Sequence, residues 1–288
     1  PRQSILLLIL QLIASSSTKT ARQSNNNSRS NRLATINDAN QLANLCMMGR
    51  LHKAEPGPEP GLTTGPCIGY SDSSCCTAEV GSRLGSNDEF AQAAFRLDHC
   101  GRRLSAECEK WFERSRCLYE CSPNLGPWLV KVSGYSWRTE RAYGVPLCHS
   151  QCQAWYAACA ADLSCVPNWS SGFRWIRQAN GSGYVNVCPD GGLAQCRSIA
   201  QLHNHKAEQF CETVWDGEFK VVPDGSPCFQ LDWSTATRKA NPNLAVTRAA
   251  SREKVAAFYY SHASVLKTAS SVLFGCALLV LRLCFVAF

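Results

Sequence analysis

Cysteine content is the feature that most limits how this chain can fold. The chain has 18 cysteines among 288 residues, and all but Cys276 and Cys284 lie between Cys46 and Cys228. Cysteines at this density are typical of exported domains that are held together by disulfides. The other sixteen are an even number, so all of them can pair, and spacing alone allows about two million pairings. We therefore predict one oxidised, secreted domain with eight disulfides.

Two cysteine pairs with Cys-x3-Cys spacing, at 117–121 and 148–152, flank a segment with unusual chemistry. Residues four apart share one face of a helix, so each pair can fasten one helix at two points. The turn-rich segment between the pairs carries Trp137, Arg138 and Arg141. An aromatic side chain beside two cations suits a flat ligand that carries carboxylates. This segment is therefore the first candidate for a binding site.

The N-terminal part of the chain differs in composition from the rest. Residues 1–17 are expected to be a signal peptide, because Arg2 precedes an apolar run that small residues follow. Residues 18–45 are rich in Asn, Ser and Arg, which predicts a flexible leader. The ordered domain is expected to span residues 46–257.

The C-terminal segment, residues 258–288, predicts attachment to a membrane. Small residues that include Ser261 and Ser264 precede a short spacer and a terminal apolar stretch, 272–288. This order is the pattern of a glycosylphosphatidylinositol (GPI) attachment signal, with the lipid carried by Ser261 or Ser264. A C-terminal transmembrane helix is the alternative. Either anchor predicts a domain on the extracellular face of the cell membrane, reached through the secretory pathway.

Hydrophobic spacing and turn residues predict the secondary structure of the domain. Residues 165–196 contain five glycines and are expected to be loop. A strand is expected over 215–222. The expected helices are residues 88–97, 104–121 and 195–211, with a further helix that starts near Pro146.

Charge and motifs exclude several classes of function. The net charge of +7 is spread without a run of Lys or Arg, so nucleic-acid binding is not expected. No serine-hydrolase, zinc-protease or phosphate-loop motif is present, so we expect neither an enzyme nor catalytic residues. Spacing matches no zinc site, so we expect no metal, and His203 and His205 should be solvated. Three Asn-x-Ser sequences predict glycosylation at Asn26, Asn168 and Asn180.

Three longer motifs resemble one known protein family. They are residues 122–128 (Ser-Pro-Asn-Leu-Gly-Pro-Trp), 136–141 (Ser-Trp-Arg-Thr-Glu-Arg) and 145–148 (Val-Pro-Leu-Cys). All three resemble the folate receptor family, which also includes riboflavin-binding proteins and the egg-surface receptor Juno. The resemblance covers residues 46–257. It implies an α+β fold, a single disulfide-rich globular domain with several helices, short strands, eight disulfides and a deep ligand cleft.

The resemblance also implies how the cysteines pair. By cysteine order, the pairs are Cys46–Cys75, Cys67–Cys117, Cys76–Cys121, Cys100–Cys196, Cys108–Cys159, Cys148–Cys228, Cys152–Cys211 and Cys165–Cys188.

A set of ligand-binding residues follows from the same resemblance. Folate receptors stack the pterin ring between aromatic side chains and bind its amino-bearing edge with an aspartate. Tryptophan, arginine, histidine and lysine hold the rest of the ligand. The matching positions are Phe95, Tyr119, Trp137, Arg138, Arg141, Gly172, Trp175 and Trp215, with Phe173 in place of a tryptophan and Ser115 in place of the aspartate.

Several positions depart from the folate receptor pattern. Ser115 lacks the carboxylate, which should cost about 2–4 kcal/mol of folate binding. Ala93 replaces a stacking tyrosine, and Glu218 replaces a serine. Ser170 and Ser171 replace a histidine and a lysine. These departures predict weaker folate binding than the family pattern provides.

The resemblance implies a GPI-anchored cell-surface receptor that binds folate or a related pteridine and delivers it into cells by endocytosis. Residues 70–76 and 155–159 look closer to riboflavin-binding proteins. Two alternatives therefore stay open. One is a binder of riboflavin or another flat heterocycle. The other is a Juno-like recognition protein that binds a cell-surface protein partner and no vitamin. The leading hypothesis, a receptor for folate or a related pteridine, predicts a small-molecule vitamin as the partner, and no cofactor is expected.

Overall fold

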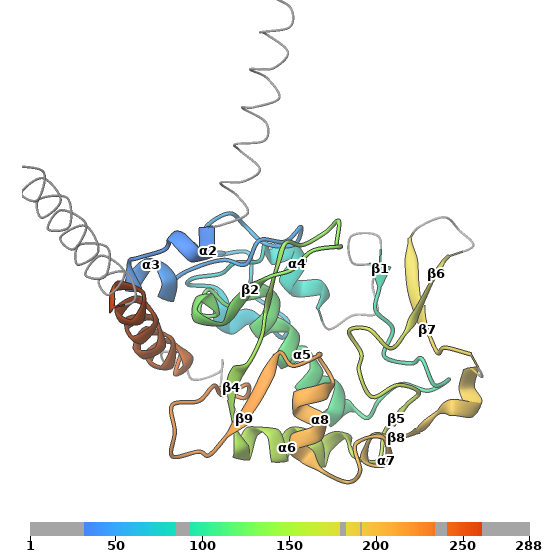
Figure 1. The fold of residues 1–288 in the computed structure, drawn as a ribbon. Helices are drawn as coiled ribbons and strands as arrows, with labels where there is room; N and C mark the ends of the chain where they lie inside the picture. The colour runs from blue at the N-terminus through green and yellow to red at the C-terminus, as the bar shows by residue number, and fades with distance from the viewer. Residues whose placement is uncertain (1–31, 85–92, 179–182, 191, 234–240, 261–288) are drawn as a thin grey trace, which may run out of the picture.

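The computed structural model describes residues 32–84, 93–178, 183–190, 192–233 and 241–260 (Figure 1). Its helices are α2 (Arg32–Thr35), α3 (Ala39–Ala43), α4 (Ala78–Arg83), α5 (Ala106–Cys121), α6 (His149–Cys159), α7 (Ile199–Leu202), α8 (Ala207–Thr213) and a helix over 243–260, with 3-10 turns η1 (Ile68–Tyr70), η2 (Gly126–Trp128) and η3 (Gly192–Gln195). Its strands are β1 (Ala93–Ala94), β2 (Leu129–Lys131), β3 (Glu140–Ala142), β4 (Val145–Cys148), β5 (Leu163–Ser164), β6 (Arg174–Arg177), β7 (Tyr184–Val187), β8 (Arg197–Ser198) and β9 (Phe219–Val222). Helices mixed with short strands confirm the expected α+β class.

The long helix α5 lies at the centre of the molecule (Figure 1). Ser105 caps it by accepting a hydrogen bond from the Cys108 backbone N–H, while the Ser105 hydroxyl donates to Asp162. Glu107 and Glu109 lie in the first turn, where carboxylates interact favourably with the helix dipole. The helix predicted over 104–121 is confirmed, and it begins at Ala106 because Ser105 is the cap.

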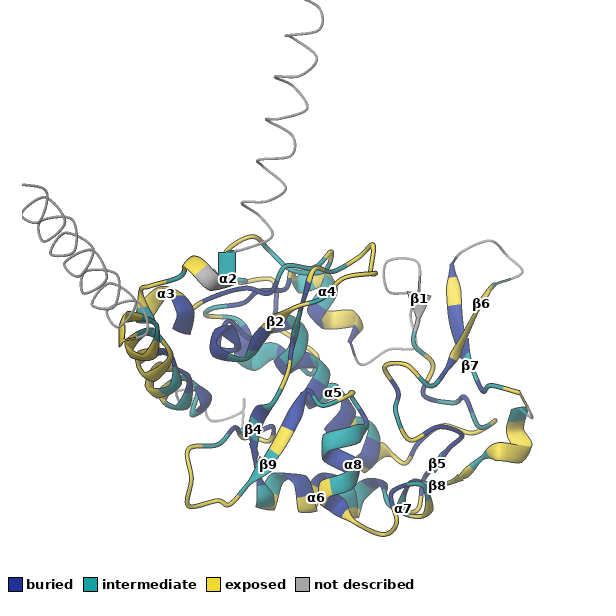
Figure 2. Cartoon of the chain, viewed as in Figure 1, coloured by how far each residue is buried: buried dark blue, intermediate teal, exposed yellow. Residues whose placement is uncertain are grey.

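The described strands form four small sheets rather than one large one, in the orders β1-β7-β6, β2-β3, β4-β9 and β5-β8. The β4-β9 pair is parallel and sets Val145 opposite Phe219. Figure 2 shows buried residues where α5, α6, α8 and this pair meet. The β4-β9 pair therefore packs against α6 and α8.

Aromatic rings fill the core between these elements. Phe112 of α5 stacks on Trp169, with ring centroids 4.2 Å apart and planes 4° apart. Trp155 of α6 meets Phe112 and Phe210 edge-on, at 5.3 and 5.2 Å. Such pairs contribute about 0.5–1.5 kcal/mol each beyond the burial of their surface. Part of the aromatic content of the sequence therefore serves the core.

Eight disulfides join the described cysteines, and every pair matches the pairing that the resemblance implies. Three of them tie α5 to α6, to the chain before η1 and to the chain before α4. In the chain-entropy account, closing loops of such lengths stabilises a fold by about 3–5 kcal/mol per bridge. The bridges thus hold α5 in place from several sides.

The helix expected over 88–97 is not present where the structure describes that segment. Ala93 and Ala94 form β1, which pairs in parallel with Tyr184 and Val185 of β7. Residues 85–92 lie outside the described residues. A short apolar run fits both helix and strand, and pairing with a distant strand decides between them.

Pro146 does not start a helix, because it lies within β4 and α6 begins at His149. Its carbonyl accepts a hydrogen bond from the Phe229 backbone N–H at 2.6 Å. A proline has no N–H to donate, so it is tolerated where only its carbonyl is needed. The prediction of a helix used only the residues next to Pro146, whereas β4 forms by pairing with β9, which is distant in the sequence.

Residues 165–196 are not all loop, because β6 and β7 pair within them and set Trp175 opposite Asn186. The single helix expected over 195–211 is divided into β8, α7 and α8. The strand expected over 215–222 is confirmed only from Phe219 onward. These segments gain order from partners far away in the sequence, which no local pattern reveals.

The leader expected to be flexible, residues 18–45, contains α2 and α3 within its described part. Leu42 is 3% exposed, and Arg32 forms an ion pair with Glu140 at 2.5 Å.

At the C-terminal end, the helix over 243–260 passes the expected boundary at 257. It contacts the domain through Thr247, whose hydroxyl donates to the Asn124 carbonyl oxygen.

His203 is buried rather than solvated, packed edge-on to Phe210 at 5.3 Å. Burial lowers its pKa to about 4.

The described part of the chain contains no helix that is both long and apolar enough to cross a bilayer. The expected signal peptide, Asn26, Asn180 and the anchor residues Ser261 and Ser264 lie outside the described residues.

Candidate functional site

The expected ligand residues fall into two neighbouring groups. The cationic group contains Tyr119, Trp137, Arg138 and Arg141, from the end of α5, from the chain before β3 and from β3 itself. The aromatic group contains Phe95, Phe173, Trp175 and Trp215. Arg141 Nη2 lies 3.5 Å from the Trp215 carbonyl oxygen and links the two groups.

The Arg138 guanidinium is only partly hydrogen-bonded by the protein. Its Nη1 donates to Tyr119 Oη at 2.7 Å, and its guanidinium carbon lies 4.4 Å from the Trp137 ring centroid and 4.7 Å from that of Tyr135. Its Nε is buried and has no hydrogen-bond partner in the described part of the chain. Trp137 is 42% exposed. The side chain therefore offers a cation and a free N–H beside an accessible aromatic surface.

Arg141 is held by the protein itself. Its Nη1 donates to Asp216 Oδ2 at 2.6 Å, and Nη2 donates to the Asp216 carbonyl oxygen. Burial opposes ionisation of Asp216, but hydrogen bonds from Arg141 and Asn168 outweigh it and keep the pKa of Asp216 below its usual value. The two arginines are therefore not equivalent, although the sequence presents them as a pair.

The aromatic group surrounds Phe95. The ring centroid of Phe95 lies 5.7 Å from that of Phe173, 6.2 Å from that of Trp175 and 5.8 Å from that of Trp215. Phe173 is buried, whereas Trp175 is 40% exposed. Trp175 is thus the member of this group that is most open to a ligand.

Ser115 is buried beneath the aromatic group and is 1% exposed. Its hydroxyl donates to the Phe112 carbonyl oxygen at 2.9 Å and accepts from Trp215 Nε1 at 3.2 Å. These two bonds use the donor of Ser115 and orient Trp215. The serine therefore orients Trp215 from inside the protein, at the position where the family resemblance implies an aspartate.

Gly172 is required by close packing. A Cβ atom at this position would lie 2.5 Å from the Asn168 carbonyl oxygen and 2.8 Å from Val166 Cβ. Ser170 and Ser171 donate their backbone N–H groups to Asn168 Oδ1. This loop is shaped by backbone contacts, and Asn168 also donates through Nδ2 to Asp216 at 2.9 Å. Glycosylation of Asn168 stays a prediction.

Two carboxylates near the cationic group extend the expected site. Glu120 of α5 has Oε2 3.3 Å from His52 Nε2. Glu218, just before β9, is 5% exposed, and burial raises the pKa of its carboxyl well above the usual value. The sequence marks Glu218 only as a departure from the family pattern, and Asp216 and Glu120 carried no signal. Their place beside the arginines depends on tertiary contacts.

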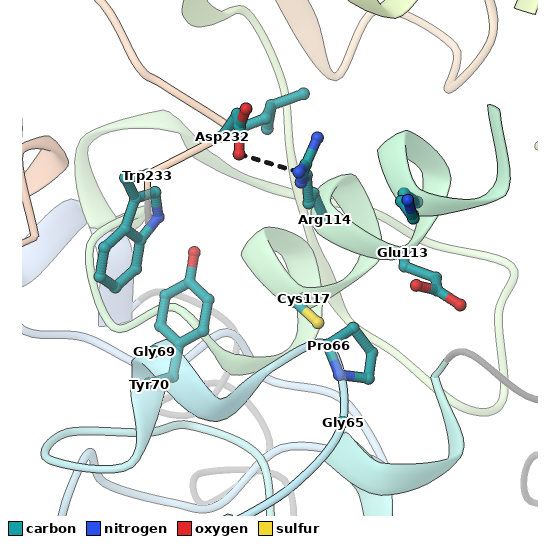
Figure 3. A pocket seen from close by; sticks show the side chains of 11 residues that line it. Gly65, Pro66, Gly69, Tyr70, Glu113, Arg114, Cys117, Asp232 and Trp233 are labelled. Atoms are coloured by element: carbon teal, nitrogen blue, oxygen red, sulfur yellow. Dashed lines mark ion pairs between the residues drawn. The ribbon is translucent and has the colours of Figure 1, made fainter. Parts of the chain in front are cut away.

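A separate pocket lies on the other face of α5 (Figure 3). An ion pair of 2.9 Å between Arg114 and Asp232 crosses it, and Tyr70 meets Trp233 edge-on. The expected ligand residues do not line this pocket, which is formed by Gly65, Pro66, Gly69, Tyr70, Lys110, Glu113, Arg114, Cys117, Leu231, Asp232 and Trp233.

Comparison with known proteins gives a consistent result. The model of the folate receptor family matches residues 45–230. The chain is 37% identical to folate receptor gamma of Homo sapiens, over 76% of this chain and 80% of that protein. It is 36% identical to folate receptor alpha of Bos taurus, over 72% and 81%. It is 32% identical to riboflavin-binding protein of Dromaius novaehollandiae, over 65% and 71%. The chain therefore belongs to the folate receptor family.

Proposed function

We propose that this protein binds folate or a related pteridine between the cationic and aromatic groups. The observation that carries the proposal is Arg138, a half-buried cation with an unused Nε–H beside the accessible ring of Trp137. A charge-assisted hydrogen bond to a ligand oxygen and a flat aromatic surface together suit a heterocycle that carries carbonyl or carboxylate oxygens. Relatives named as folate receptors support the same ligand class.

A binding role fits the site better than catalysis. The titratable groups of the cationic group are held by one another, as in the Arg138–Tyr119 and Arg141–Asp216 contacts. Nucleophilic catalysis needs a nucleophile that is hydrogen-bonded to a base. Ser115, whose hydroxyl contacts Trp215 of the aromatic group, instead bonds to a carbonyl oxygen and an indole N–H.

Titration of the purified domain tests this function. Trp137 and Trp175 are both partly exposed, so a ring bound against them should quench tryptophan fluorescence. Folic acid, a reduced folate and riboflavin should be compared at equal pH. Saturable quenching by either folate supports the proposal. Absence of quenching and of calorimetric heat with every one of these compounds would contradict it.

Riboflavin is the second candidate ligand, and Ser115 favours it. The family aspartate that binds the amino-bearing pterin edge is absent, and Ser115 is committed to Phe112 and Trp215. A relative named as a riboflavin-binding protein is 32% identical. Stronger quenching by riboflavin than by folic acid would identify riboflavin as the preferred ligand. Failure of all vitamins would leave the recognition of a cell-surface protein as the leading function.

We also propose that the protein is tethered to the outer face of the cell membrane by a GPI anchor and carries its ligand inward by endocytosis. Small residues followed by an apolar tail support the anchor. Phosphatidylinositol-specific phospholipase should release the protein from cells that express the full precursor. Retention of the protein together with an intact tail peptide would favour a transmembrane helix.

A further inference from the structure

Glu218 is a buried carboxyl group whose side chain lacks a full set of partners. The residue is 5% exposed, and its Oε1 atom has no hydrogen-bond partner among the described residues. Burial of a carboxyl group without compensating hydrogen bonds is costly. Such a group persists in a fold where it serves a purpose other than stability, and ligand binding is one such purpose.

The backbone of Glu218 is held firmly. Its N–H donates to the Trp215 carbonyl oxygen at 3.3 Å, and its carbonyl oxygen accepts from the Val145 N–H at 2.7 Å. The carboxyl group therefore starts from a rigid position at the entry to β9, next to Trp215. A rigid support is what a residue that selects between ligands requires.

The cations near Glu218 donate hydrogen bonds to other residues. Arg141 is bound to Asp216, and Arg138 donates to Tyr119. Burial is the largest effect on the pKa of the Glu218 carboxyl group and raises it. The positive charge of Arg141 lowers this pKa, the negative charge of Glu120 raises it, and the positive charge of Arg138 lowers it more weakly. The cations are thus near enough to influence the carboxyl group, yet Glu218 forms no ion pair with a described residue.

Ser115 and Glu218 lie on either side of Trp215 in the hydrogen-bond network. Ser115 accepts from the indole N–H of Trp215, and Glu218 donates its backbone N–H to the carbonyl of the same residue. Ser115 has already committed its hydroxyl proton to Phe112. Of the two positions, only Glu218 offers a carboxyl group, and N–H bonds donated by an amino-bearing ring edge would favour its ionised form.

We propose that Glu218 is the specificity-determining residue of the site, accepting hydrogen bonds from the amino-bearing edge of a nitrogen heterocycle while Arg138 Nε donates to an oxygen of the same ligand. This inference rests on the proposed function. A carboxylate can accept two parallel N–H bonds, from a ring nitrogen and its adjacent amino group. An imide edge, as in a flavin, would instead turn a carbonyl oxygen toward the carboxylate. Glu218 therefore selects a 2-amino pteridine over a ring with oxygen at that position.

Two probes that differ only at this edge test the inference. Pterin-6-carboxylate carries a 2-amino group, and lumazine-6-carboxylate carries a 2-oxo group on the same ring. The wild-type domain should bind the pterin at least about tenfold more tightly, the value of one charge-assisted hydrogen bond. Glu218→Gln should lose most of this preference, because an amide presents only one acceptor oxygen. Glu212→Gln, which breaks an exposed pair with Lys220, is the matched control and should keep it.

Thermal unfolding without ligand gives an independent measurement. The folded state holds the Glu218 proton more tightly than the unfolded state, so the carboxyl group destabilises the fold increasingly as pH rises above about 4.5. Glu218→Gln should therefore melt at a higher temperature than wild type at neutral pH, and the difference should shrink toward pH 4.

The outcomes separate the inference from the proposed function. If wild type binds folic acid but shows no preference between the probes, or if Glu218→Gln keeps the preference, the inference is wrong and the function stands. A lower melting temperature for Glu218→Gln at neutral pH would show an internal partner and would also overturn the inference. If wild type binds no pteridine and no flavin, both are wrong.

Discussion

Replacing Arg138 by alanine should weaken ligand binding far more than it weakens the fold. The substitution removes the donor to Tyr119 at 2.7 Å, the cation over Trp137 at 4.4 Å and the free Nε–H. A charge-assisted hydrogen bond contributes about 1.5–3 kcal/mol, which corresponds to roughly 10- to 150-fold in affinity. The free Nε–H has no partner to lose in the unliganded fold, so its contribution should appear only in binding.

Arg141→Ala is the matched control, because the same residue type lies on the same chain segment but is already paired. Asp216, its partner, is about half exposed, so solvent screens the pair, and a screened ion pair contributes about 0–1 kcal/mol to stability. The guanidinium that Asp216 occupies is not free for a ligand. We therefore expect Arg141→Ala to change affinity by less than about fivefold.

The measurement is a fluorescence or calorimetric titration of both variants with the ligand that binds wild type most tightly, together with thermal unfolding of each. The expected order of affinity is wild type, then Arg141→Ala close behind, then Arg138→Ala. Equal losses in the two variants would refute the distinction between a free and a paired arginine. An unchanged affinity in Arg138→Ala would refute the proposed role of its Nε–H.

Three further predictions concern the fold. Alkylation without reductant, followed by mass spectrometry, should label none of the sixteen cysteines between Cys46 and Cys228, and two or more labelled thiols would contradict the eight bridges. Gly172→Ala should destabilise the domain by about 1–3 kcal/mol, since its methyl group would overlap the Asn168 carbonyl oxygen, and an unchanged melting temperature would show that the loop can move. Burial lowers the pKa of His203 to about 4, so the unfolded state binds more protons below pH 6.5 and stability should fall as pH drops from 6.5 toward 4. His203→Met should flatten this part of the pH profile of the melting temperature, and an unchanged slope would assign the effect to other groups.

The sequence by itself determined the features that depend on composition and on neighbouring residues. Cysteine density indicated an oxidised domain, and helical spacing of apolar residues predicted α5 to within two residues. The Trp137-Arg138 segment pointed to the cationic group for the same reason, because its chemistry is contiguous in the chain. The pairing of the cysteines came from the family resemblance, since spacing alone permits too many combinations.

Only the tertiary structure decided what depends on residues far apart. Ala93 and Ala94 form strand β1 instead of the predicted helix, because β7 supplies backbone partners. Pro146 lies in strand β4, because that strand pairs with β9. Two arginines that look alike in sequence became different when Asp216 bound one and left the other with a free N–H. Glu218 became a buried carboxyl group only through its packing near Trp215. Local patterns record propensity, whereas burial, pairing and pKa are set by the groups that folding brings together.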